Sequence, residues 1–266
     1  MKKRIKINNT NYFSKEICEI YTGSSEIKSM LQCEACTLAK LRGEWIEESS
    51  TALKQSSYVD AWMSNELEEF KKENPDVFTK QGTLKSEYKL AENIIEQIKE
   101  DSMFMKYITA GENQVIMTGE ISNVPIKIKI DCYHKNKCIT DLKCVKDFDL
   151  IWNDKTKQKE NFIDYYQYTL QAALYQEIVQ QNTGKQLPFI IAACTKQKYS
   201  QRALFQIPQQ IIDSELLFLQ NFLPHLQDLK QGKIQPTSCG HCDYCISKKK
   251  VDRIWYYDDY FKSKGE

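Results

Sequence analysis

Glycine and proline are scarce in this sequence, with 9 and 6 residues among 266. Their scarcity excludes collagen-like, linker-like and low-complexity classes of protein. Long apolar runs are missing too, because the longest one, Leu187–Cys194, is far too short to cross a bilayer. Excess charge of either sign is also lacking, with 37 Lys and Arg against 36 Asp and Glu. This balance excludes a general nucleic-acid coat but leaves room for a local basic patch.

Cysteine, in contrast, is abundant, with 10 residues. No apolar run follows the basic residues 1–6, so we expect no secretion signal, a cytoplasmic location and no contact with a membrane. In the cytoplasm, ligation of a metal or cluster explains cysteines better than disulfide bonds do. The 41% hydrophobic content is ordinary for a globular protein of this length.

The hydrophobic periodicity changes along the chain, and the change predicts the fold class. Apolar residues at helical spacing predict helices, and alternating apolar residues predict short strands joined by turns. One continuous apolar run predicts a buried strand. The expected helices are 24–72 in several pieces, 84–100, 161–181 and 208–230. The expected strands are 115–118, 125–131, 138–142 and Leu187–Cys194. This order predicts an α/β fold with a mixed central sheet flanked by helices, preceded by extra N-terminal helices.

Two carboxylates and a lysine fall on neighbouring strands. Asp131 is expected to end one strand, and the spacing of two between Asp141 and Lys143 puts both on one face of the next. A hairpin can bring all three together as a site for Mg²⁺, which prefers one or two carboxylates plus water and phosphate oxygens. Such a metal would activate water against a phosphodiester, with Lys143 orienting the water or stabilising charge. The alternative is that these charged residues simply lie on a solvent-exposed face of a hairpin. Against it, the apolar Ile139 shares the strand face of Asp141 and Lys143.

The spacing Asp131-x9-Asp141-x-Lys143 resembles the core of PD-(D/E)xK nucleases, which have a restriction-endonuclease-like fold. Gln171 and Tyr175 share one helix face because they are four residues apart. They resemble the Gln-x3-Tyr motif of RecB-type nucleases. That resemblance implies that the two side chains help to shape the active site and contact DNA.

The segment Ser56–Asp60 resembles the Gly-x3-His segment of the same nucleases, in which a helix delivers a metal ligand. Ser56 stands for the glycine and Asp60 for the histidine. An aspartate still binds Mg²⁺ or Mn²⁺, so we expect Asp60 to be a ligand. An ordinary surface carboxylate is the alternative, and Glu92 and Glu96 are weaker candidates for the same role.

Three thiols lie within seven residues at Cys239, Cys242 and Cys245, which suits a tetrahedral sulfur site. The fourth ligand would be Cys33 or Cys36. Some RecB-type nucleases, including the AddB class and CRISPR adaptation nucleases, carry a [4Fe-4S] cluster on one early and three late cysteines. This resemblance favours Cys33.

Zn²⁺ is the rival to the cluster, bound by Cys36 and the three late cysteines, or with His241 as a substitute ligand. Free thiols are the third alternative. Either metal centre would tie the two ends of the chain together and be structural. The remaining cysteines are expected to be small core residues: Cys18, Cys132, Cys138, Cys144 and Cys194.

Taken together, these motifs resemble phage-type PD-(D/E)xK exonucleases of the RecE/RecB-like superfamily. The resemblance implies a metal-dependent deoxyribonuclease that degrades linear DNA ends for recombination, with a RecT-type single-strand annealing protein as a partner. It implies a single nuclease domain over 1–266, with a helical part (24–80), a catalytic core (84–200) and a Cys-rich end (205–266). The residues alone support a metal-dependent phosphodiesterase. Two other classes stay open, a non-catalytic DNA-binding scaffold and an iron–sulfur carrier.

Overall fold

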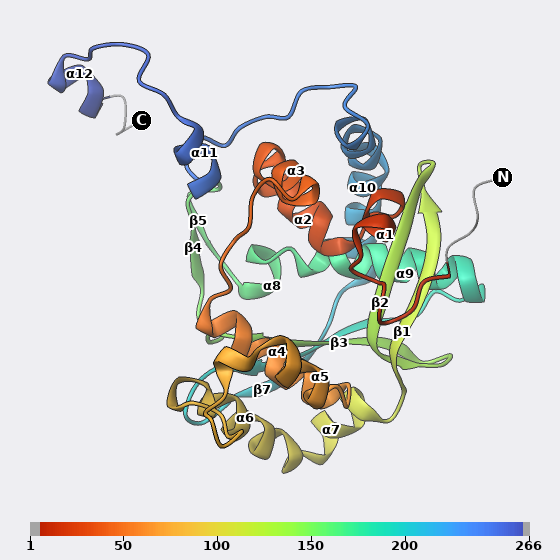
Figure 1. Cartoon of the computed structure of the whole chain (residues 1–266). Helices are drawn as coiled ribbons and strands as arrows, with labels where there is room; N and C mark the ends of the chain where they lie inside the picture. The colour runs from red at the N-terminus through yellow and green to blue at the C-terminus, as the bar shows by residue number, and fades with distance from the viewer. Residues whose placement is uncertain (1–5, 263–266) are drawn as a thin grey trace.

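The computed structural model describes residues 6–262 (Figure 1). The basic residues 1–5, used above to expect no secretion signal, lie outside the described residues. The described chain forms a five-stranded sheet in the order β1-β2-β3-β6-β7, in which β3 and β6 are parallel and the other neighbours antiparallel. The strands of this sheet are β1 (Glu112–Ile121), β2 (Val124–His134), β3 (Cys138–Val145), β6 (Phe189–Thr195) and β7 (Arg202–Gln206). A separate two-stranded ribbon consists of β4 (Ile151–Asn153) and β5 (Gln158–Glu160).

Helices cover both faces of the sheet, which confirms the expected mixed α/β fold (Figure 1). One face packs against α4 (Thr51–Met63), α5 (Leu67–Glu73), α6 (Lys89–Lys99) and α7 (Ser102–Thr109). The other packs against α2 (Ser24–Gln32), α3 (Glu34–Arg42), α9 (Tyr168–Thr183) and α10 (Gln209–Lys230). The shorter helices are α1 (Lys15–Ile20), α8 (Phe162–Tyr165), α11 (Asp243–Lys248) and α12 (Tyr257–Lys262), with 3₁₀ turns at Pro75–Val77 and Ser86–Tyr88. None of the described helices is long and apolar enough to cross a membrane.

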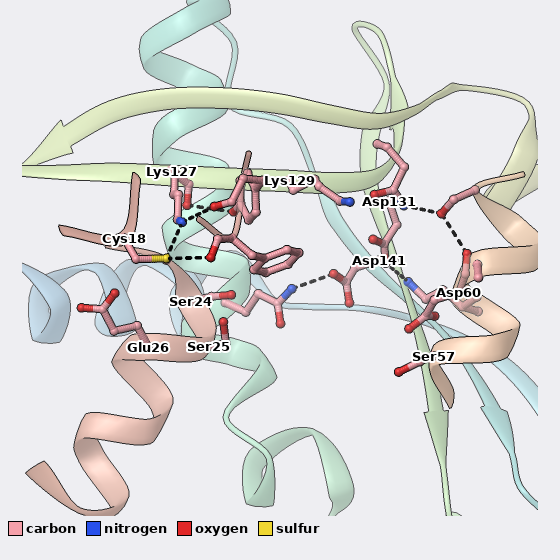
Figure 2. A pocket seen from close by; sticks show the side chains of 18 of the residues that line it. Cys18, Ser24, Ser25, Glu26, Ser57, Asp60, Lys127, Lys129, Asp131 and Asp141 are labelled. Atoms are coloured by element: carbon pink, nitrogen blue, oxygen red, sulfur yellow. Dashed lines mark hydrogen bonds between the residues drawn. The ribbon is translucent and has the colours of Figure 1, made fainter. Parts of the chain in front are cut away.

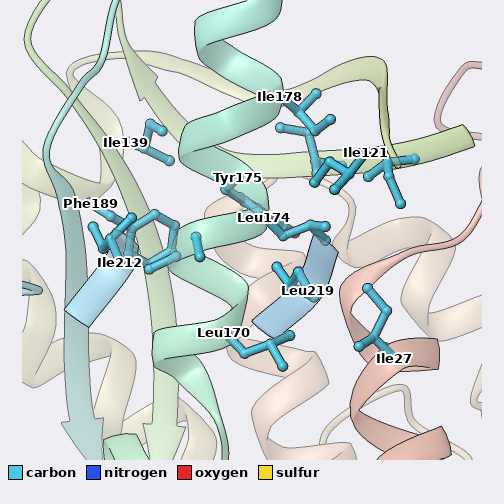
Figure 3. Packing of buried hydrophobic residues seen from close by; sticks show 14 of the residues in the cluster. Ile27, Ile121, Ile139, Leu170, Leu174, Tyr175, Ile178, Phe189, Ile212 and Leu219 are labelled. Carbon is cyan, nitrogen blue, oxygen red and sulfur yellow. The ribbon is translucent and has the colours of Figure 1, made fainter. Parts of the chain in front are cut away.

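Helix α9 lies in the middle of the larger core (Figure 3). Leu170, Leu174 and Ile178 are almost fully buried against the sheet and α10. Burying each such side chain contributes about 1.5–3 kcal/mol. Because so much of α9 is packed, the polar side chains that it carries are held in fixed positions.

The expected helix over 161–181 is interrupted in the structure. Gln167 has a left-handed backbone with φ of 55°, so the chain ends α8 and starts α9 in a new direction. The periodicity of apolar residues continues through this break, and for that reason the sequence did not reveal it. The short elements α7 and β7 were not expected either.

Strands β2 and β3 pair at three positions near their shared turn: Cys132 with Thr140, Tyr133 with Ile139, and His134 with Cys138. Beyond these pairs, β2 continues along β1, whereas β3 continues along β6. An N-terminal residue pairs with part of the edge of β2 that β3 leaves unpaired. Thr22 donates its N–H to the carbonyl of Pro125 (2.9 Å) and accepts the N–H of Lys127 (3.0 Å).

One expectation about β2 was wrong. Asp131 does not end the strand, because the three residues after it pair with β3 and extend β2 to His134. Lys127, also on β2, is covered by the N-terminal segment and only 3% exposed. Its ammonium lies 3.2 Å from Sγ of Cys18 and 4.5 Å from the ring centre of Tyr12.

Gly111 offers a test of how closely the start of β1 approaches β2. A Cβ there would lie 2.6 Å from the carbonyl oxygen of Tyr133 and 2.9 Å from Sγ of Cys132. We expect Gly111→Ala to lower the free energy of unfolding by about 1–3 kcal/mol, as overpacking does. Urea denaturation measures it, with Gly23→Ala as the control, because a Cβ at Gly23 meets its nearest neighbour at 3.7 Å. Equal stabilities of the two variants would contradict the close packing.

Candidate active site

A cavity of about 690 Å³ lies where β2 and β3 separate, between α2, α4 and α9. Its walls carry most of the residues that the sequence singled out. They include Asp60, Lys127, Lys129, Asp131, Asp141, Lys143, Gln171 and Tyr175. Figure 2 shows Asp60, Asp131 and Asp141 together at one end of this cavity, with Lys127 and Cys18 at the other. The carboxylates therefore meet although they come from three different elements.

Asp141 is the most buried of these carboxylates, with 2% of its surface exposed. Its Oδ2 forms an ion pair with Nζ of Lys143 at 2.5 Å, as their shared strand face predicted. Its Oδ1 accepts a hydrogen bond of 2.6 Å from Nε2 of Gln171. Burial disfavours the charge on Lys143, but Asp141, Tyr168 and Asp131 outweigh it and raise the pKa of the ammonium. Lys143 is therefore a permanent cation in this cavity.

Asp131 lies next to the point where β2 and β3 part. Its Oδ2 accepts the backbone N–H of Leu142 at 2.9 Å, so the carboxylate replaces the strand-to-strand bond that is lost there. Burial raises the pKa of Asp131 well above its usual range, and the nearby Asp141 and Asp60 raise it further. Protonation of this side chain is thus favoured until a cation compensates the crowded negative charge.

Asp60 reaches the cavity from α4. That helix is held against β3 by Ser56, whose Oγ donates to the carbonyl of Cys144 at 3.3 Å and accepts from Nζ of Lys196 at 3.2 Å. The small residue at position 56 allows this approach. Asp60 is exposed as a residue, but the protein around its carboxyl group raises the pKa of that group to about 7, and Asp141 adds to that effect against the opposing pull of Lys143.

The donor set in this cavity fits a hard divalent cation. Mg²⁺ takes one or two carboxylates and fills its other positions with water and phosphate oxygens. The carboxylates of Asp60, Asp131 and Asp141 raise one another's pKa, but among the described residues their oxygens are not gathered into one compact group of three ligands. The fit to a divalent cation therefore rests on the type of donor atom and not on a preformed three-carboxylate site.

Gln171 and Tyr175 face the cavity from α9 and are 4% and 6% exposed. Gln171 bonds to Asp141, as described. The hydroxyl of Tyr175 donates to the carbonyl of Lys129 at 3.1 Å, on the edge of β2 that β3 has left. Gln171 therefore orients the carboxylate of Asp141, and Tyr175 binds the part of β2 that is not paired with β3.

Lys28 does not line the cavity itself, but it contacts Gln171, which does, and the sequence did not reveal this contact. Its Nζ donates to Oε1 of Gln171 at 3.2 Å and lies 5.0 Å from the ring centre of Tyr168, while Nζ of Lys143 lies 4.9 Å from the same ring. Burial and the charge of Lys143 lower the pKa of Lys28 to about 8. A lone lysine on an amphipathic helix carries no sequence signal for such a place.

Some candidates do not reach the cavity. Glu92 and Glu96 are exposed on α6 and are not part of its walls. Lys196 binds the carbonyl of Ala52 and the hydroxyl of Ser56, so it positions α4. Lys196 does not line the cavity, although its charge lowers the pKa of Asp60.

The four sulfur atoms of Cys33, Cys239, Cys242 and Cys245 all lie within 4.8 Å of one another, far along the chain from the carboxylates. Among the described residues, Cys36 is not part of this group, and Nδ1 of His241 is bonded to the carbonyl of Cys239. The group of neighbouring sulfur atoms therefore includes Cys33 and not Cys36. Of the other cysteines, Cys132, Cys138 and Cys194 are buried and Cys18 and Cys144 are half-buried.

The comparisons with known proteins agree with this geometry. The family described as a PDDEXK-like domain of unknown function (DUF3799) matches residues 23–248. The crystal structure of a candidate exonuclease from Eubacterium rectale is 36% identical, covers 96% of this chain and 98% of that one, and superimposes with a TM-score of 0.89. The structure of SSO0001 is 12% identical over 73% of this chain and 86% of that one, and its TM-score of 0.28 supports no argument. A search of curated proteins finds no match.

The raised pKa of Asp60 predicts a pH dependence of stability. In the unfolded chain this group ionises near pH 4, but in the folded protein it ionises near pH 7. Folding therefore favours the protonated form, and stability should fall as the pH rises from about 4 to about 7.

Thermal unfolding at pH 5 and pH 8, without added divalent cations, measures this effect. Other groups also titrate, so the difference between wild type and Asp60→Asn is the quantity of interest. The variant should lose less stability between pH 5 and pH 8 than wild type does. An unchanged pH dependence in Asp60→Asn would show that this carboxylate is not shielded.

Proposed function

The chain belongs to this PDDEXK-like family, and from that premise we propose that it is a Mg²⁺-dependent deoxyribonuclease that degrades the ends of linear DNA. The family and the fold support a nuclease of the PD-(D/E)xK type, as the strand motif suggested. The observation that carries the proposal is the meeting of Asp131, Asp141 and Lys143 in one cavity.

In this proposal Asp131 and Asp141 hold Mg²⁺ or Mn²⁺, with Asp60 as a third ligand from the opposite wall. The bound ion supplies a Lewis acid that lowers the pKa of water and neutralises charge on the phosphodiester. Lys143 is fixed by Asp141 and stays charged, so it orients the attacking water or stabilises negative charge that develops on the phosphate.

The surrounding residues keep these groups in place. Gln171 donates to Asp141 and accepts from Lys28, so its amide fixes one carboxylate oxygen and joins it to a cation on α2. Lys28, held behind Gln171, adds positive charge next to the cavity, which favours a DNA phosphate there. Tyr175 keeps β2 apart from β3 through the carbonyl of Lys129.

The description of the E. rectale protein as a candidate exonuclease supports action at DNA ends. By the resemblance to phage enzymes, the DNA is degraded for recombination in the cytoplasm, with a RecT-type annealing protein as partner. Residues 1–266 would act as a single nuclease domain. Digestion of linear against circular duplex DNA with Mg²⁺ tests end dependence, and equal rates on both substrates would contradict it.

Asp141→Asn and Lys143→Ala should each lower the rate of DNA cleavage by at least about 100-fold, because each removes a charge used in the transition state. Binding to DNA should persist in a gel-shift assay. Glu92→Gln is the matched control, since it removes a carboxylate outside the cavity and should leave cleavage unchanged. Cleavage at the wild-type rate by either cavity variant would contradict the proposal that this cavity is the active site.

Gln171→Ala and Tyr175→Phe should lower the rate less, by roughly 10–100-fold, because they position other groups. For Gln171→Ala we also expect a higher Mg²⁺ concentration at half-maximal rate, since Asp141 loses its orienting bond. Single-turnover cleavage across a Mg²⁺ titration measures both quantities. Full activity with an unchanged Mg²⁺ requirement would show that this face of α9 only packs against the sheet.

A further inference from the structure

The group of four cysteines joins segments that are about 200 residues apart in the sequence. Cys33 ends α2 and begins α3, and the other three lie in the loop before α11 and in its first turn. Two further contacts hold this loop on α3. Ala35 donates its N–H to the carbonyl of Thr237 at 3.1 Å, and the carboxylate of Glu34 accepts the N–H of Thr237 at 2.7 Å. Hydrogen bonds between these two segments therefore help to hold the four sulfur atoms near one another.

The distances between these sulfur atoms discriminate between the metal centres. A single tetrahedral Zn²⁺ with bonds of about 2.3 Å places neighbouring sulfurs about 3.8 Å apart. In a [4Fe-4S] cluster each thiolate binds a different corner of a cube, which spreads them to roughly 6 Å. Here Sγ of Cys245 lies 3.5 Å from Sγ of Cys33 and 3.8 Å from Sγ of Cys239, and no pair in the group exceeds 4.8 Å.

The loop is also shaped for thiolate ligands around one ion. The N–H of Cys242 points to Sγ of Cys239 at 3.4 Å, and the N–H of Cys36 points to Sγ of Cys33 at 3.4 Å. Gly240 has a left-handed backbone with φ of 77°, which lets the chain turn between Cys239 and Cys242. Such N–H···S bonds stabilise the negative sulfur that a metal requires.

We propose that Cys33, Cys239, Cys242 and Cys245 bind one Zn²⁺ as a mononuclear tetrahedral site, and that the [4Fe-4S] cluster carried by some RecB-type nucleases does not fit here. Four cysteines close the coordination sphere, so the site is structural. It fixes the junction of α2 and α3, and α2 carries Lys28, which contacts Gln171 of the nuclease cavity. The zinc site does not depend on the proposed nuclease activity.

Metal analysis of the untagged full-length protein tests this proposal. The protein is purified without oxygen from cells supplied with both zinc and iron, and zinc, iron and acid-labile sulfide are measured per chain. We expect about one zinc, no iron and no sulfide. X-ray absorption at the zinc edge should show a single shell of four sulfurs at about 2.3 Å.

The matched pair Cys33→Ser and Cys36→Ser tests the ligand set, because both cysteines are buried and lie three residues apart. Cys33→Ser should lose most of its zinc and unfold at a lower temperature, whereas Cys36→Ser should keep about one zinc. If Cys33→Ser does not fold, the metal content and X-ray absorption spectrum of the wild-type protein still distinguish zinc from an iron–sulfur cluster.

Three results would overturn the proposal. About four irons with sulfide per chain would establish the cluster, and one iron without sulfide would establish a mononuclear iron site. Wild-type protein with no metal would establish free thiols. Equal loss of zinc from Cys33→Ser and Cys36→Ser would show that the ligand set is wrong.

Discussion

The separation of β2 from β3 after three residue pairs is the constraint on which the rest of the site depends. A strand that leaves its neighbour exposes backbone N–H and C=O groups, and each must find a partner because buried unpaired groups are costly. In this protein the partners are Thr22, the hydroxyl of Tyr175 and the carboxylate of Asp131. The same separation opens the cavity in which the charged residues meet.

Crowding of negative charge is the second feature of the cavity. Three carboxylates share it with the fixed ammonium of Lys143; burial raises the pKa values of Asp60 and Asp131, and repulsion between the carboxylates raises them further. In the proposed function a divalent cation would relieve this repulsion. The bonds from Gln171 to Asp141 and from Leu142 to Asp131 hold the two carboxylates in fixed orientations.

The cysteine group connects with this cavity through α2. Cys33 lies at the end of that helix, and Lys28, one turn earlier, bonds to Gln171 on α9. A metal centre at these cysteines, as proposed, would restrain α2, which lines one wall of the cavity. The 22-residue helix α10 contributes from the outside, since Lys230 forms an ion pair of 2.9 Å with Glu26 on α2.

The sequence by itself determined the parts that depend on local spacing. Alternation placed Asp141 and Lys143 on one strand face, the interval of four placed Gln171 and Tyr175 on one helix face, and the dense cysteines predicted a metal centre. These are consequences of the fixed geometry of strands, helices and short loops. Only the tertiary structure decided how far β2 runs past Asp131, that Lys127 is buried, that Lys28 reaches Gln171, and that Cys33 rather than Cys36 joins the sulfur group. Each of these depends on contacts between segments distant in the chain, and local patterns contain no information about which segment covers another.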